Sequence, residues 1–155
     1  MNATILFPGE ASGPLLVLEE PLSFWGGIDP ETGAVINPRH PQCGRSVSGT
    51  ILVMPEPIGS STSSAVLLEL IRNRKAPAGI LLGRPDAILV VGCLVAREMG
   101  WAAPPVMVGQ APRALAQGTP AQLGAHGLQP LPGGAAAGAA PWVRATAGAS
   151  GDAAK

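Results

Sequence analysis

The chain has 155 residues, ten basic and ten acidic side chains, and 46% hydrophobic residues. This length fits one domain with a real core, and the hydrophobic content argues against global disorder. The balanced charge offers no electrostatic footprint for nucleic acid or acidic membranes. The sequence has no apolar run of about 18 residues and no charged leader before a hydrophobic region, which predicts a soluble, cytoplasmic protein.

Residue types that bind metals are few. Cys43 and Cys93 lie far apart and outside any motif, which is typical of reduced thiols. Two cysteines cannot hold an iron–sulfur cluster alone, because the common sites need four ligands, or three and an open position. His40 and His126 are the only histidines, so a zinc site is not predicted. The chain by itself is expected to bind no metal and no cofactor.

Short apolar segments separated by turn residues predict strands in the first third of the chain. Residues 3–7 and 14–18 predict two strands, which we expect to pair as a hairpin. Residues 34–37 predict another short strand. Residues 49–55 predict a buried strand and give the clearest strand signal in the sequence.

The middle of the chain predicts helices alternating with buried strands. A helix is expected over residues 63–74, since its apolar residues recur on one face. A buried strand is expected over residues 79–82. Residues 86–99 predict a helix in their C-terminal part, while periodicity leaves 87–91 open between strand and helix.

The ends of that second helix have their own signals. Residues 84–86 are expected to form a turn or a helix start, with Pro85 suited to the first helical position, and Gly100 is expected at the stop. Residues 104–108 then predict the last buried strand. From about residue 111 the chain becomes rich in alanine, glycine and proline, so we expect loose packing to about residue 131 and disorder beyond about 133. The predicted organisation is a folded domain over 1–110 and an extension over 111–155.

Phe24 and Trp25 are two of only five aromatic residues, and they stand directly before Gly26 and Gly27. Large side chains on a glycine loop suggest the wall of a pocket or a partner surface. A plug over the edge of a small barrel explains them equally well. Further along, His40 is expected to make a structural hydrogen bond, with a place for His40 and Arg39 at the edge of a site as the alternative.

Five consecutive hydroxyl residues follow Gly59, at the point where the first long helix is expected to begin. They are Ser60, Ser61, Thr62, Ser63 and Ser64. The N–H groups and partial positive charge of a helix N-terminus suit a carboxylate, a phosphate or a developing oxyanion. A serine there can also act as a base in an electropositive site. A simple N-cap accounts for one hydroxyl and leaves the others as a polar linker.

Rival motifs for this segment are missing. A hydrolase elbow G-x-S-x-G fails because residue 63 is serine, and neither a Walker sequence nor a G-x-G-x-x-G occurs. A serine nucleophile would need a base, and His40 is the one candidate in the predicted domain. The hydroxyl segment therefore looks like half of a site, which suggests a subunit.

Several segments together resemble the small, swivel-domain subunit of aconitase X. They are S-F-W-G-G-I-D-P-E-T-G at 23–33, the pair His40 and Pro41, G-S-S-T-S-S-A-V-L-L-E at 59–69, A-P-A-G-I-L-L at 76–82 and P-D-A-I-L at 85–89. The match covers about residues 3–108. It implies an α/β fold of the swivelling β/β/α type, with a small barrel-like sheet and two or three flanking helices. The C-terminal tail, which composition predicts to be disordered, lies outside the match.

The resemblance also implies a hydro-lyase, formed as a heterodimer with a large subunit that carries the cysteine ligands of an iron–sulfur cluster. Bacterial members dehydrate cis-3-hydroxy-L-proline, and archaeal relatives dehydrate mevalonate 5-phosphate. The composition favours the first substrate. The alternatives are the second substrate, a non-catalytic module that binds phosphate or carboxylate, and, more weakly, a serine hydrolase. No contact with nucleic acid or membrane is expected.

In aconitases proper, a G-S-S loop of the swivel domain supplies a serine base, which falls here on Ser60. Its neighbours are then candidates for substrate binding: Ser61, Thr62, Ser63, Ser64, Phe24, Trp25, Gly26 and Gly27. Those enzymes place a substrate-gripping arginine where Thr62 stands. Carboxylate recognition is therefore expected from N–H groups at the helix end, other hydroxyls or the partner.

Overall fold

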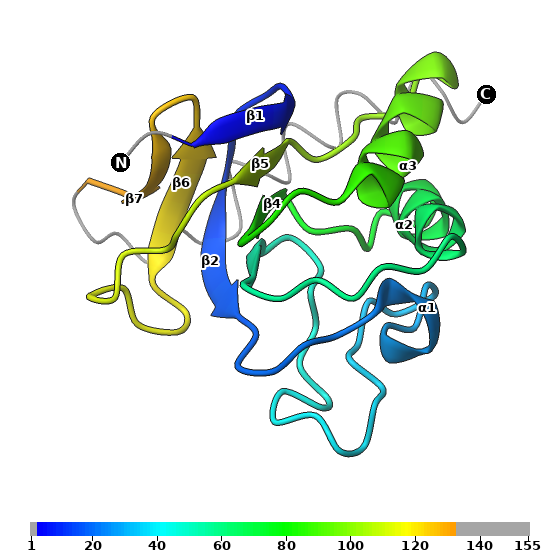
Figure 1. Cartoon of the computed structure of the whole chain (residues 1–155), viewed down its shortest axis with the longest axis horizontal. Coiled ribbons are helices and arrows are strands. Elements are labelled where there is room, and N and C mark those ends of the chain that lie inside the picture. Colours follow the sequence, from blue (N-terminus) through cyan, green and yellow to red (C-terminus); the bar gives the residue numbers. More distant parts are fainter. Residues whose placement is uncertain (1–2, 133–155) are drawn as a thin grey trace.

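The computed structural model describes residues 3–132, which form a seven-stranded mixed sheet with three helices (Figure 1). The strands are β1 Thr4–Phe7, β2 Ala11–Val17, β3 Ile51–Met54, β4 Gly79–Leu82, β5 Val106–Val108, β6 Pro120–Gly124 and β7 Gly127–Pro130. The helices are α1 Phe24–Gly27, α2 Ser63–Arg72 and α3 Ala87–Glu98. The sheet order is β1-β5-β4-β3-β2-β6-β7, curled into a half-barrel, which confirms the predicted fold class.

Four parallel strands form the centre of the sheet, in the order β2, β3, β4, β5. All four residues of β3 and all four of β4 are buried, because both faces of the sheet are covered. The helices cover one face, and the β6–β7 hairpin covers the other (Figure 1). Parallel neighbours need crossover connections, which α2 and α3 provide. Both helices therefore begin at the edge where the central strands end.

The two long helices pack directly on each other. The predicted apolar face of α2 is buried and consists of Val66, Leu67, Leu70 and Ile71. On α3, Gly92 lies against the first turn of α2, since a Cβ there would stand 2.9 Å from the carbonyl oxygen of Ser64. The absence of a side chain at Gly92 thus sets how closely the middle of α3 approaches the first turn of α2.

The predicted hairpin between the first two strands is wrong. β1 pairs antiparallel with β5 at one edge of the sheet, whereas β2 lies between β3 and β6. The segment read as a hairpin connection, residues 10–13, mostly belongs to β2, which begins at Ala11. β2 buries both Leu15 and Leu16, one toward each face, as expected for a strand inside a sheet whose two faces are covered.

The prediction of loose packing after residue 111 is also wrong. β6 pairs with β2 from Ala11–Leu123 to Pro14–Pro120, and β7 folds back on β6. On β6, the buried residues Ala121 and Leu123 flank the exposed Gln122, and Leu128 of β7 is buried as well. The division predicted at residue 110 falls between β5 and β6 of this sheet. The disorder predicted beyond about 133 lies outside the described residues.

Smaller differences concern element ends. α3 starts at Ala87 with Asp86 as its N-cap, so Pro85 precedes the cap instead of opening the helix, and 87–91 is helical. Residues 34–37 make only isolated bridges, from Ala34 to Ser46 and from Val35 to Ile28. Gly100 has φ +78° directly after the last turn of α3, as its stop role predicts. Over residues 3–132, no helix has the length and hydropathy needed to cross a bilayer.

Candidate active site at the serine loop

Residues 55–62, which we call the serine loop, connect β3 to α2 at the edge where the central strands end. The loop is attached to the segment before α1, because Pro57 bridges Leu22 in parallel register. Ile58 also points its N–H toward the Leu22 carbonyl, at 3.5 Å. Gly59 is exposed and would meet nothing within 4 Å if it carried a Cβ. The middle of the loop therefore stands open on the surface.

The first turn of α2 begins without a side-chain cap. Thr62 occupies the N-cap position in a helical conformation, and its hydroxyl makes no capping hydrogen bond. The turn is closed by backbone bonds alone, from Ser63 N–H to the Ser60 carbonyl at 2.9 Å and from Val66 N–H to the Thr62 carbonyl at 3.2 Å. An uncapped start leaves the positive end of the helix dipole available to an anion.

The five hydroxyl residues fall into two groups. Ser60 is half-buried, and Ser61 and Thr62 are exposed, so these three border the open part of the loop. Ser63 is buried, and its Oγ has no hydrogen-bond partner among the described residues. The hydroxyl of Ser64 donates to the carbonyl of Ile88 and ties α2 to α3. This bond favours a structural role for Ser64 over the predicted substrate contact.

Phe24 and Trp25 take opposite positions on the short turn α1, which lies beside α2 (Figure 1). Phe24 is buried, whereas the Trp25 side chain is 60% exposed. Gly26 has φ +74°, and a Cβ on Gly27 would stand 2.7 Å from Leu22 Cδ1. Phe24 thus fits the plug interpretation, and Trp25 is the aromatic side chain that is free to act as a wall.

His40 and Arg39 belong to the irregular 37–45 segment. The buried His40 ring bridges two backbone groups, since its Nε2 donates to the Glu20 carbonyl at 2.9 Å and its Nδ1 accepts from Gln42 N–H at 3.0 Å. Arg39 is exposed and donates its backbone N–H to the Asn37 side chain. With both ring nitrogens engaged, the geometry supports the structural interpretation of His40.

Arg84 is a residue at this edge that the sequence reasoning used only as part of a turn. Its guanidinium Nη2 donates to the carbonyl of Pro57 at 3.3 Å and lies 3.5 Å from Glu56 Oε2. A basic residue two positions after a buried parallel strand was the available signal, because neighbouring parallel strands end at the same edge. The structure thus places a cation directly on the serine loop.

Within residues 3–132, no group of three or more His, Cys, Asp or Glu side chains is arranged to hold a metal ion. Of the two cysteines, Cys43 is exposed and Cys93 is buried in α3. Burial raises the pKa of the Cys93 thiol to about 12. A thiol that keeps its proton in this way is a poor ligand and a poor nucleophile.

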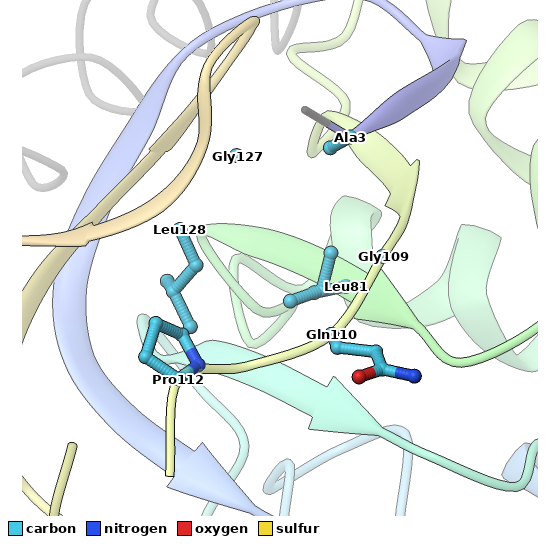
Figure 2. A pocket seen from close by; sticks show the side chains of 7 residues that line it. All are labelled: Ala3, Leu81, Gly109, Gln110, Pro112, Gly127 and Leu128. Atoms are coloured by element: carbon cyan, nitrogen blue, oxygen red, sulfur yellow. The ribbon is translucent and has the colours of Figure 1, made fainter. Parts of the chain in front are cut away.

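A small cavity of about 40 Å³ lies elsewhere in the molecule, on the side of the β6–β7 hairpin (Figure 2). Leu81, Pro112 and Leu128 contribute much of its apolar wall. Such a volume holds about three water molecules and no substrate-sized molecule. The chemistry-bearing residues gather instead at the serine loop.

Comparison with known proteins identifies relatives of this chain. A family model described as aconitase X swivel domain matches residues 1–126. A cis-3-hydroxy-L-proline dehydratase of Pseudomonas aeruginosa is 51% identical over 94 residues, which make up 61% of this chain and 16% of that protein. A phosphomevalonate dehydratase small subunit of Methanothermobacter thermautotrophicus is 40% identical over 96 residues, or 62% of this chain and 73% of that one.

A solved structure shows the same architecture. The crystal structure of Thermococcus kodakaraensis aconitase X in its holo-form superposes with a TM-score of 0.74 at 31% identity, over 84% of this chain and 96% of the other. The Pseudomonas dehydratase is much longer, and the present chain spans about a sixth of it. The family match covers most of the chain, in sequence and in fold. The chain belongs to the aconitase X swivel domain family.

Proposed function

We propose that this chain is the small subunit of a two-subunit, aconitase X-type dehydratase and that the serine loop is its half of the active site. The observation that carries the proposal is the uncapped start of α2, with Ser60 half-buried beside it and Ser61 and Thr62 exposed. A carboxylate-bearing substrate fits such a helix end, because its charge is stabilised by the dipole and the first N–H groups. The exposed Trp25 and Gly26 would line the same opening.

In the proposed reaction, Ser60 Oγ removes the proton α to the substrate carboxylate. A free serine is far too weak an acid for this role, so its deprotonated form must be stabilised by the positive end of α2 and nearby donors. An iron–sulfur cluster in the large subunit would supply the Lewis acid for the leaving hydroxyl. This chain then contributes the base and the anion-binding surface.

The substrate proposed first is cis-3-hydroxy-L-proline, because a relative at 51% identity carries that name. Mevalonate 5-phosphate is the second candidate. It is favoured by the relatives named phosphomevalonate dehydratase small subunit, one of which is matched over 73% of its length. A non-catalytic swivel module that binds phosphate or carboxylate at the same helix end is the rival class.

The proposal is tested by combining the purified chain with an aconitase X large subunit from the same organism, loaded with its cluster. We expect turnover of cis-3-hydroxy-L-proline by the pair and no turnover by either subunit alone. Mevalonate 5-phosphate is assayed in parallel. Binding of either compound without turnover by the assembled, loaded pair would favour the non-catalytic module, and iron bound by the small chain alone would contradict the half-site.

A further inference from the structure

The connections that follow β3 and β4 are locked together at the edge of the sheet. Gly83, the first residue after β4, donates its N–H to the Met54 carbonyl at 2.9 Å. A Cβ on Gly83 would stand 2.1 Å from the carbonyl oxygen of Pro55, so the two backbones are in direct contact there. Whatever side chain follows Gly83 is therefore held next to the serine loop.

That side chain is Arg84, and its guanidinium is only partly used. Both of its contacts, to the Pro57 carbonyl and to the Glu56 carboxylate, are made by Nη2. Nη1 and Nε have no partner among the described residues, and the side chain is 63% exposed. The Glu56 side chain is equally exposed, and such surface ion pairs hold their partners weakly. A bidentate ligand can therefore bind the free donors while the Pro57 contact stays in place.

The serine loop offers hydroxyls and a helix end but no cation of its own, although both candidate substrates carry a carboxylate. The other basic side chains of residues 3–132 lie on other parts of the fold. They are Arg39 and Arg45 in the 37–45 segment, Arg72, Arg74 and Lys75 at the C-terminal end of α2, Arg97 on the last turn of α3 and Arg113 between β5 and β6. A ten-residue helix is about 15 Å long, so the cluster at the end of α2 is far from its start.

We infer that Arg84 binds the substrate carboxylate at the serine-loop site and sets the preference for anionic substrates. The inference rests on the proposed function, because it assigns a role within that active site. Arg84 acts through free guanidinium donors, and its bond to the Pro57 carbonyl fixes the orientation of those donors relative to the loop that carries Ser60.

The test uses the reconstituted pair with Arg84→Gln in the small chain. Loss of a charge-assisted hydrogen bond to the carboxylate should raise KM for cis-3-hydroxy-L-proline about 10- to 100-fold and change kcat by less than about 3-fold. Inhibition by pyrrole-2-carboxylate should weaken by a similar factor, whereas inhibition by the uncharged pyrrole-2-carboxamide should not change. Arg84→Lys keeps the charge and should recover part of the loss.

Two controls separate substrate binding from a structural role. Arg72→Gln removes an arginine that pairs with Glu69 at the far end of α2 and should leave KM unchanged. Glu56→Gln removes the ion pair and keeps the arginine, so KM should stay the same or fall. The inference is overturned if Glu56→Gln raises KM as Arg84→Gln does. It is also overturned if Arg84→Gln weakens inhibition by the carboxamide as much as inhibition by the carboxylate.

Wild-type turnover decides which idea has failed. If the wild-type pair is active and Arg84→Gln has the wild-type KM, only the Arg84 assignment is lost. If the wild-type pair turns over neither substrate, the proposed function fails and the assignment fails with it. If Arg84→Gln does not assemble with the large subunit, Arg84→Lys replaces it, and an unchanged carboxylate inhibition constant in that variant counts against the inference.

Discussion

The connections that lead into α2 and α3 follow neighbouring parallel strands, yet they begin their helices in opposite ways. The connection into α3 has four residues, 83–86, and the carboxylate of Asp86 accepts the Ile88 N–H at 2.9 Å. The connection into α2 has eight residues, 55–62, and its N-cap residue Thr62 makes no side-chain cap. We call the start of α3, which has a side-chain cap, closed, and the start of α2, which has none, open.

This difference teaches where function resides in the fold. At the closed start, Asp86 accepts an N–H group of the first turn of α3, and Gly83 packs against the backbone of Pro55. Such a start anchors the scaffold. An open start keeps those groups for a ligand at some cost to stability, which is common at functional sites. The following changes are arranged to break or sharpen the contrast.

The largest effect is expected from Ser60→Ala at the open start. Ser60 is the proposed general base, so its removal should lower kcat of the reconstituted pair ~10²- to 10⁴-fold. Assembly with the large subunit, measured by size-exclusion chromatography, should be unchanged. Ser61→Ala is the matched neighbour and should cost much less. Turnover near the wild-type rate in Ser60→Ala would assign the base to another residue.

Gly83→Ala at the closed connection should cost about 3 kcal/mol of unfolding free energy, since the new methyl group would collide with the Pro55 carbonyl. Gly59→Ala introduces the same atom in open space and should change the unfolding free energy by no more than about 0.5 kcal/mol. Urea unfolding of the full chain measures both variants. Equal midpoints for the two would show that the connections are not locked as described.

Asp86→Ala removes the cap of α3 and should lower the unfolding free energy by about 1 kcal/mol. Thr62→Ala stands at the corresponding position of α2 and should change it by no more than about 0.5 kcal/mol, because no capping bond is lost. The same urea titration compares them. A larger loss in Thr62→Ala than in Asp86→Ala would contradict the contrast between a closed and an open helix start.

Ser63→Ala should stabilise the chain by about 1 kcal/mol, because the substitution removes a buried hydroxyl that has no partner within residues 3–132 and adds a better helix former. Ser64→Ala should destabilise it by a similar amount, since the bond to the Ile88 carbonyl is lost. The pair of adjacent serines thus gives opposite signs in one thermal or urea unfolding experiment. Equal signs would mean that the two hydroxyls are not in the different environments described here.

Much of the candidate site could be predicted from local sequence. The period of the apolar residues locates α2, and the hydroxyl segment before it locates the open helix start. The four-residue segment at 79–82 predicts β4 with the same bounds that the structure shows. These features depend on neighbours in the chain, so they are visible without coordinates.

Assignments within the hydroxyl segment were less accessible. Sequence treats the five hydroxyls as equivalent, but Ser64 is used to hold Ile88 and Ser63 is enclosed. His40 likewise becomes structural because Glu20, twenty residues earlier, supplies an acceptor. Each outcome depends on a group that is brought near by the fold.

By itself, the sequence determined the helix that carries the serines, the strands on either side of it and the family to which the chain belongs, because local periodicity and short motifs encode these features. Only the tertiary structure decided that β1 pairs with β5, that the glycine- and alanine-rich hairpin β6–β7 completes the sheet, and that Arg84 stands on the serine loop. Strand partners and contacts between loops join residues distant in the chain. They are selected by burial on both faces of the sheet, which local pattern does not record.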